Sequence, residues 1–202
     1  MSDDETPTVL GVLSDTHGFL DPRVFDIFDG VDHILHAGDL GSESVAVELE
    51  AISPVTVVAG NVDAHLPPGR FPALRLFQAG RTRILIVHEA IVRGKPLPAV
   101  EDHVRDHRAD LVIFGHTHKP YAGRPAPGGG GSGGGGGDCF FFNPGSAGKK
   151  RFTLPRTVGR LVVAPGGGIA GRLISLEGRT EDEREFAAPG REAGGLGVEM
   201  LS

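Results

Sequence analysis

The stretch T-V-L-G-V-L-S-D-T-H, residues 8–17, joins a short apolar run to an aspartate and a histidine. The apolar part, Thr8 to Leu13, predicts a buried strand, because strands covered on both faces read as nearly continuous hydrophobic runs. Asp15 and His17 are two residues apart, so in an extended segment their side chains point the same way. We therefore expect a strand end that presents a carboxylate and an imidazole to one pocket.

The same arrangement recurs along the chain. The motifs are A-G-D with Asp39, A-G-N-V-D with Asn61, I-V-H-E with His88, and F-G-H-T-H with His116 and His118. Parallel strands gather their carboxyl ends at one edge of a sheet, so residues far apart in sequence can converge there. Glycines before Asp39, Asn61 and His116 permit tight turns off the strand ends. We interpret the seven residues as two halves of one dinuclear metal site.

Each motif alone has a simpler interpretation. D-x-H and G-D occur often in turns, G-H-T-H can form a surface loop, and Asn61 and Asp63 can cap or turn the chain. The complete ordered set, with every member at a predicted strand end, is hard to explain by turns. The donors are oxygens and imidazoles without thiolate, which suits transition metals better than Ca²⁺ or Mg²⁺. We expect two divalent ions, Mn²⁺ first, with Ni²⁺, Co²⁺, Fe or Zn²⁺ as alternatives.

The rest of the pattern predicts βαβαβ first and then mostly strands, which two packed sheets flanked by helices would accommodate. Asp21 and Ser42 are expected helix caps, and Pro22 the first residue of its helix. Strands are expected at 8–13, 33–36, 54–59, 74–78, 82–87, 111–114, 140–142, 159–164 and 169–176, and helices at 22–28, 42–50 and 98–107.

Length and composition limit the organisation. With 202 residues, 39% of them hydrophobic, the chain suits one domain. We expect that domain over residues 1–180, with a flexible glycine-rich insertion at about 125–138 and a disordered tail at 181–202. Whether the glycine run is natural or an engineered linker is left open by the sequence.

Charge and cysteine content exclude some classes. The net charge of −6, with 20 basic and 26 acidic residues, gives no strong signal for nucleic-acid binding. The single cysteine, Cys139, excludes an intrachain disulfide and fits a reducing compartment. No signal peptide is evident, and no apolar run approaches the roughly 20 residues of a membrane span. We expect a soluble cytoplasmic protein without a membrane partner, and a homo-oligomer is compatible with the sequence.

The ordered set D-x-H, G-D, G-N, H and G-H-x-H, from Val9 to Leu176, resembles the calcineurin-like metallophosphoesterase superfamily. Short length, G-N-V-D and the later N-P-G-S at residues 143–146 resemble its small bacterial and archaeal phosphodiesterase branch. The resemblance implies the α/β class: a four-layer α/β/β/α sandwich of two mixed sheets flanked by helices. It also implies a small phosphoester substrate.

The resemblance further implies a role for each residue. One metal would take Asp15, His17 and His118, the other Asn61, His88 and His116, with Asp39 as the bridge and Asp39, Asn61 and His88 as catalytic residues. A metal-bridging hydroxide would attack phosphorus in line with the leaving oxygen of a phosphodiester. The alternatives are a phosphomonoesterase or phosphatase, and a non-catalytic scaffold of the same fold.

Two positions depart from the family pattern. Val62 stands where many members have a histidine thought to protonate the leaving group, which predicts a preference for acidic leaving groups. Glu89 stands where the family usually has glycine. Its carboxylate is expected to orient His88, or else to crowd the metal or repel an anionic substrate. The other histidines are expected to be structural or exposed, with His36 packed near Asp39.

Overall fold

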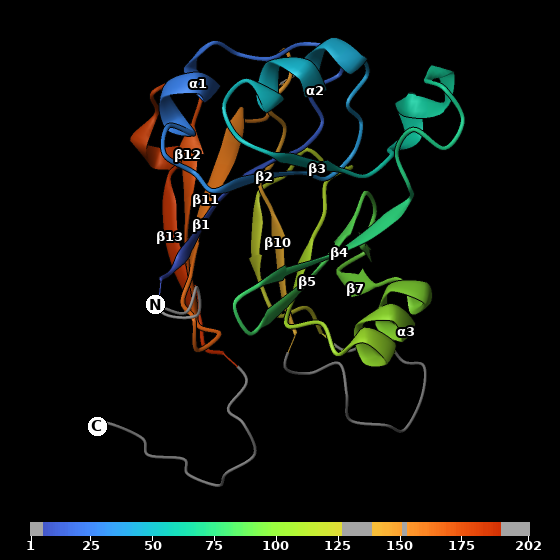
Figure 1. Ribbon diagram of the computed structural model, residues 1–202, viewed down its shortest axis with the longest axis vertical. Helices are drawn as coiled ribbons and strands as arrows, with labels where there is room; N and C mark the ends of the chain where they lie inside the picture. The colour runs from blue at the N-terminus through green and yellow to red at the C-terminus, as the bar shows by residue number, and fades with distance from the viewer. Residues whose placement is uncertain (1–5, 127–138, 151–152, 191–202) are drawn as a thin grey trace, which may run out of the picture.

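The computed structural model describes residues 6–126, 139–150 and 153–190, which form two mixed sheets flanked by helices (Figure 1). The first sheet contains β1 (Thr8–Leu13), β2 (His33–His36), β3 (Val55–Val57), β11 (Thr157–Val163), β12 (Ile169–Ser175) and β13 (Arg184–Ala188), in the order β13-β12-β11-β1-β2-β3. The second contains β4 (Leu74–Ala79), β5 (Thr82–Val87), β8 (Leu111–Ile113), β9 (Tyr121–Gly123) and β10 (Phe140–Asn143), in the order β4-β5-β8-β10-β9. The remaining elements are the ribbon β6 (Ile91–Val92) and β7 (Lys95–Pro96), the helices α1 (Arg23–Ile27), α2 (Glu43–Glu50) and α3 (Pro98–His107), and the 3-10 turns η1 (Asn61–His65) and η2 (Thr180–Asp182).

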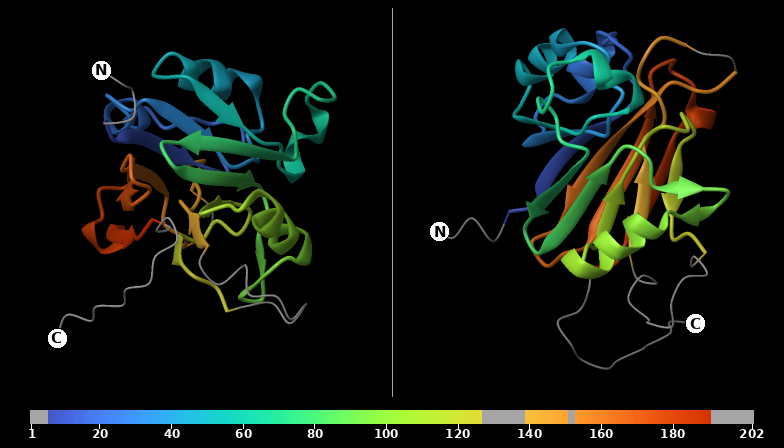
Figure 2. Two further views of the ribbon diagram at one scale, coloured as in Figure 1. Left: turned by 60° about the horizontal axis from the view of Figure 1, so that its bottom comes forward. Right: turned by 90° about the vertical axis from the view of Figure 1, so that its right-hand side faces the viewer.

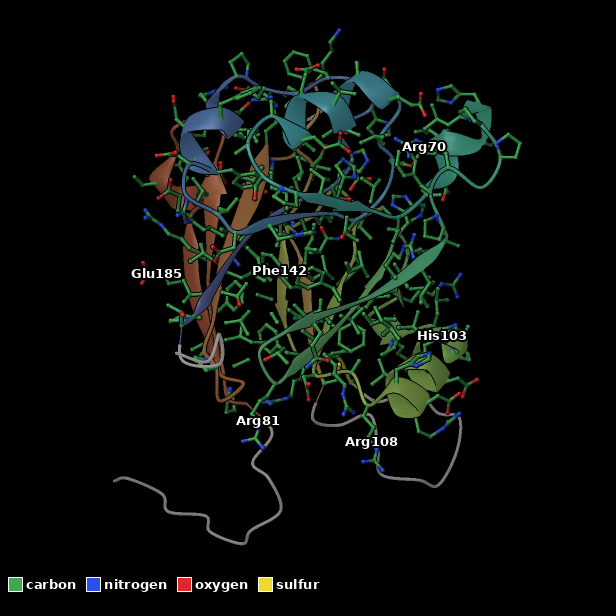
Figure 3. All side chains as sticks on the ribbon, in the orientation of Figure 1. Arg70, Arg81, His103, Arg108, Phe142 and Glu185 are labelled. Carbon is green, nitrogen blue, oxygen red and sulfur yellow. The ribbon has the colours of Figure 1, made fainter. Side chains whose placement is uncertain are left out.

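Three apolar clusters hold four layers together. Strand β1 contributes residues to two of these clusters from its two faces. Leu10 and Val12 lie in the cluster between the sheets, whereas Leu13 lies in the cluster under α1 and α2. Phe142 of β10 belongs to the cluster between the sheets (Figure 3). Helix α3 covers the other side of the second sheet (Figure 2). Val100 and Val104 are the residues of α3 that are buried in the third cluster. The predicted four-layer sandwich is confirmed.

Parallel pairing brings strand ends from both sheets to one edge. In the first sheet β1, β2 and β3 run parallel, and in the second β5, β8 and β10 do. Backbone hydrogen bonds then join the loops that follow: the Asp15 amide donates to the Gly38 carbonyl at 3.0 Å, and the Gly115 amide donates to the His88 carbonyl at 2.9 Å. These loops contain the seven residues singled out above.

Most predicted elements near this edge are confirmed, and the start of helix α1 differs. Ser42 caps α2 as expected, because its side chain accepts from the Ser44 amide at 3.3 Å. Helix α1 begins one residue later than predicted, with Pro22 at the cap position. The Asp21 carboxylate still accepts from the Arg23 amide at 3.0 Å, so it serves the same turn.

The expected boundary of the tail at residue 181 is wrong. Residues 184–188 form β13, which pairs antiparallel with β12. The ring of Phe186 stacks on Phe140 and also contacts Phe142, with centroids 5.5 and 4.9 Å apart respectively. Phe186 therefore packs β13 onto the fold, although the charged residues around it gave no sign of a strand in the sequence. The glycine run at 127–138 and residues 191–202 lie outside the described residues. Within the part of the chain that the structure describes, no helix is long and apolar enough to span a membrane.

Candidate metal centre

Four of the predicted residues form one compact group of donors. Candidate ligand atoms of Asp15, His17, Asp39 and His118 all lie within 4.8 Å of one another. His17 Nε2 is 3.3 Å from His118 Nε2, and His118 Nε2 is 3.2 Å from Asp15 Oδ1. Two donors bound to one ion, each at about 2.1 Å, are separated by roughly 3.0–3.5 Å. The first group therefore has the spacing of ligands around a single transition metal.

A second group begins at the other oxygen of Asp39. His88 Nε2 lies 3.4 Å from Asp39 Oδ1, whereas His17 Nε2 lies 3.7 Å from Asp39 Oδ2. The rings of His88 and His116 meet edge to face, with centroids 5.2 Å apart. The Asp39 carboxylate thus faces one histidine from each group, which is the placement expected of a bridging ligand.

The backbone orients the ring of His88. Its Nδ1 donates to the Ala37 carbonyl at 2.8 Å, so in the neutral ring Nε2 keeps its lone pair. Among the described residues, His88 Nε2 is a buried side-chain nitrogen with no hydrogen-bond partner. Buried polar atoms are normally satisfied, and a metal ion would satisfy this one.

Asn61 reaches the site through its backbone position. It opens η1, and the amide of the next residue, Val62, donates to Asp39 Oδ1 at 2.9 Å. Asn61 is exposed, and the described contacts locate its backbone rather than its side chain. Six of the seven predicted residues are thus brought together by side-chain contacts, and the seventh by its neighbour.

Backbone conformation marks the same residues. Of the seven non-glycine residues with positive φ in the described ranges, five are candidate ligands: Asp15 (55°), His17 (49°), Asp39 (54°), His116 (68°) and His118 (57°). This conformation costs an L-residue on the order of 1–3 kcal/mol and tends to persist at functional sites. The fold therefore accepts strain at the positions that turn each donor off its strand end.

Further residues hold the donors in place, and sequence reasoning missed them. Asp63 accepts from the Gly41 amide at 2.8 Å and the Gly60 amide at 2.7 Å, tying together the loops after β2 and β3. Ser14 Oγ donates to Asp15 Oδ2 at 2.6 Å, and Ser146 Oγ donates to the Asp15 carbonyl at 3.0 Å. Asp63 and Ser146 lie in the quoted motifs G-N-V-D and N-P-G-S. Their presence was visible there, but their hydrogen-bond partners were not.

Protonation of the metal-free centre follows from its charges. Burial opposes ionisation of Asp39, but the His88 ring, the Val62 amide and the nearby charge of His17 together lower its pKa to about 2. Burial also opposes protonation of His88, but the Asp39 carboxylate and the Ala37 carbonyl raise the pKa of that ring above its usual value. A ligating imidazole must be neutral, so protonation of His88 would compete with binding of a metal there.

His36 lies behind the donors and is fully buried. Its Nδ1 accepts from the Gly38 amide at 3.2 Å, which leaves Nε2 to donate to Thr16 Oγ1 at 2.9 Å. Thr16 Oγ1 in turn donates to the Leu40 carbonyl at 3.0 Å. Burial lowers the pKa of His36 to about 4, although nearby carboxylates, Asp15 first, oppose this. His36 is therefore a neutral structural residue near Asp39, as its sequence context suggested.

This histidine predicts a pH dependence of stability. We expect the free energy of unfolding of the metal-free protein to fall as pH drops from about 6.5 to about 4. In that window the unfolded chain binds a proton at this position while the folded protein does not, so acid favours unfolding by up to roughly 3 kcal/mol. His33, whose pKa burial also lowers, contributes in the same direction.

Urea unfolding in chelator across this pH range measures the effect. His36→Gln should flatten the dependence, while His65→Gln, at an exposed histidine, should retain it. An unchanged slope in the His36→Gln variant would contradict the account of the buried ring.

Glu89 does not orient His88, which corrects one expectation. The Ala37 carbonyl already occupies His88 Nδ1. Glu89 instead points to the neighbouring candidate ligand, with Oε1 3.5 Å from His116 Nε2. Its carboxylate therefore belongs to the outer rim of the second donor group.

The four-layer fold and this cluster of aspartate and histidine define a metallophosphoesterase-type protein. Residues 9–165 match the family model of the calcineurin-like phosphoesterase superfamily domain. The chain belongs to this superfamily, whose members bind divalent metals.

Two archaeal proteins are similar in sequence. A probable metallophosphoesterase of Methanothermobacter thermautotrophicus is 36% identical over 118 residues, which is 56% of this chain and 68% of that protein. The probable metallophosphoesterase MJ0623 of Methanocaldococcus jannaschii is 32% identical over 120 residues, which is 56% of this chain and 60% of that protein. The match thus spans about two thirds of the length of the first relative and three fifths of the length of the second.

Solved structures share the fold at low identity. Vacuolar Protein Sorting 29 of Cryptosporidium parvum has a TM-score of 0.68 at 19% identity, covering 91% of this chain and 98% of that one. A predicted phosphoesterase of Streptococcus pneumoniae has a TM-score of 0.61 at 22% identity, covering 90% and 98%. Vps29 of Entamoeba histolytica, solved in complex with Zn²⁺, has a TM-score of 0.66 at 19% identity, covering 90% and 98%.

Proposed function

We propose that this protein is a phosphodiesterase that depends on two divalent transition metal ions. The observation that carries the proposal is the position of Asp39, whose two carboxylate oxygens face His17 and His88 in two separate donor groups. One ion would be held by Asp15, His17, Asp39 and His118, the other by Asp39, Asn61, His88 and His116. When bound, such a pair acidifies water and neutralises charge on the phosphoryl oxygens.

The chain's own residues prepare this chemistry. Asp15 is oriented by the Ser14 hydroxyl and by the His116 amide, which donates to Asp15 Oδ2 at 3.1 Å. The Val62 amide holds one oxygen of Asp39, and the Ala37 carbonyl sets the tautomer of His88. Donors fixed before substrate arrives need little reorganisation during the reaction. The fixed, buried positions of Asp15, Asp39 and His88 therefore support the proposal that the protein is an enzyme.

Activity of the metal-loaded protein tests the proposal. We expect metal-stripped protein to hydrolyse bis(p-nitrophenyl) phosphate once Mn²⁺ is restored, and p-nitrophenyl phosphate more slowly. Ni²⁺, Co²⁺ and Zn²⁺ belong in the same titration, and the zinc complex of the Entamoeba protein supports including Zn²⁺. Faster turnover of the monoester would favour a phosphomonoesterase. No turnover with any of these ions would favour a non-catalytic scaffold.

The leaving group supplies a separate prediction. Val62, which is 39% exposed, has a side chain with no proton to give. His65 is close in sequence, but it is an exposed residue whose described contact, from Nδ1 to the Val62 carbonyl at 2.6 Å, lies outside both donor groups. Without a general acid, which typically contributes 10²–10⁴-fold, expulsion of a basic alkoxide is slow. We expect kcat to be at least roughly 100-fold higher for aryl than for alkyl phosphodiesters.

A series of phosphodiesters whose leaving groups differ in pKa measures how strongly kcat depends on the leaving group. Val62→His should raise kcat for the alkyl esters, whereas Val162→His, at an exposed valine of β11, should not. Equal kcat for alkyl and aryl esters in the wild-type protein would contradict the prediction.

A further inference from the structure

Glu89 is fixed next to His116 by the backbone on both sides. The His88 carbonyl accepts from the Gly115 amide at 2.9 Å, so the residues that follow, Glu89 and His116, become neighbours. On the other side, the Ala90 carbonyl accepts from the Leu97 amide at 2.9 Å. Because the carbonyls of both neighbouring residues accept hydrogen bonds, the backbone of Glu89 is fixed at the rim of the second donor group.

The distance between the two side chains is that of ligands that share an ion. Glu89 Oε1 is 3.5 Å from His116 Nε2, within the range of 3.2–3.7 Å found among the other donor pairs of the centre. A charge-assisted N–H···O bond would be shorter, at about 2.7–2.9 Å. Both side chains are partly exposed, 40% for Glu89 and 34% for His116, so an ion pair between them alone would be weak.

We propose that Glu89 is an additional ligand of the metal held by Asn61, His88 and His116. The inference rests on the proposed function, because it requires that second ion. An eighth donor gives this ion a third oxygen ligand beside those of Asp39 and Asn61. Carboxylate oxygen favours Mn²⁺ relative to the softer zinc-type sites, which agrees with the choice of Mn²⁺ as first ion to test.

Calorimetric titration of the metal-stripped protein with Mn²⁺, without substrate, tests this assignment. We expect two binding steps in the wild-type protein and, in Glu89→Gln, binding at one step weaker by more than the roughly 10- to 100-fold typical of a residue that only supports a ligand. Glu89→Asp keeps the charge but withdraws the carboxylate by one methylene, and it should weaken the same step. Glu185→Gln is the matched control, because Glu185 is exposed on β13 at the far edge of the first sheet (Figure 3).

The outcomes separate the inference from the proposed function. Wild-type affinity, or tighter binding, in Glu89→Gln would overturn the role of Glu89, since it would mean that the carboxylate only pairs with His116. Weaker binding in Glu89→Gln but wild-type binding in Glu89→Asp would also overturn it, in favour of a charge effect. A wild-type protein that binds fewer than two ions would instead overturn the two-metal function.

Discussion

His118→Ala should strongly reduce phosphodiesterase activity while leaving the fold intact. His118 Nε2 lies within 3.3 Å of both His17 Nε2 and Asp15 Oδ1, so the substitution removes one donor from the centre of the first group. Loss of a partner beyond the direct ligands typically costs 10–100-fold, and loss of a ligand should cost more. We expect kcat/KM to fall on the order of 10³-fold, measured with bis(p-nitrophenyl) phosphate at saturating Mn²⁺.

His103→Ala is the matched control for this result. His103 lies on α3, beyond the second sheet, where its ring stacks on His107 (Figure 3). That variant should keep wild-type activity, and both variants should keep the wild-type circular dichroism spectrum. A His118→Ala protein that is folded and fully active would refute the assignment of His118 as a ligand.

Gly60→Ala should damage both stability and metal binding. A methyl group at Gly60 would overlap the Asp39 amide nitrogen, which is backbone, and Asp39 Oδ1, which the Val62 amide holds in place. The Gly60 amide also donates to Asp63, which ties the loops after β2 and β3. Relief of the overlap must therefore move the loop that carries Asp39, together with its carboxylate. We expect the free energy of unfolding to fall by about 2–4 kcal/mol and Mn²⁺ affinity to fall with it.

Gly166→Ala controls for the loss of a glycine as such. A methyl group there meets no atom within 4 Å, and the residue lies outside the positive-φ region. Its free energy of unfolding, measured by urea denaturation, should stay within about 0.5 kcal/mol of the wild type. If Gly60→Ala and Gly166→Ala were equally stable, the close contact between Gly60 and Asp39 would not constrain the residue at position 60.

Local pattern was sufficient to predict the elements that position the site. The strand His33–His36 and the helix Pro98–His107 have the predicted bounds, because short apolar runs and helical spacing are properties of adjacent residues. Convergence of Asp15, His17, Asp39, His88, His116 and His118 could also be predicted, since parallel strands place their carboxyl ends together. What could not be predicted depends on contacts between distant segments. β13 depends on Phe186 meeting Phe140 and Phe142 across the sheets, and its own charged sequence contains no sign of them.

The same limit applies inside the centre. From the sequence, Glu89 was expected to contact its neighbour His88. The hydrogen bond between the His88 carbonyl and the Gly115 amide instead brings the Glu89 side chain next to His116. Asp63 was open to interpretation as a simple turn residue, and the structure shows that it also binds the loop that carries Asp39. Partners of this kind become visible only when the backbone register between loops is known.

The most direct test of the account is an anomalous difference map from crystals of the protein grown with Mn²⁺. The account predicts two peaks separated by roughly 3.5–4 Å, one within reach of Asp15, His17 and His118, the other within reach of Asn61, His88 and His116, with Asp39 between them. A single peak, or two peaks that do not share Asp39, would contradict the proposed two-metal centre.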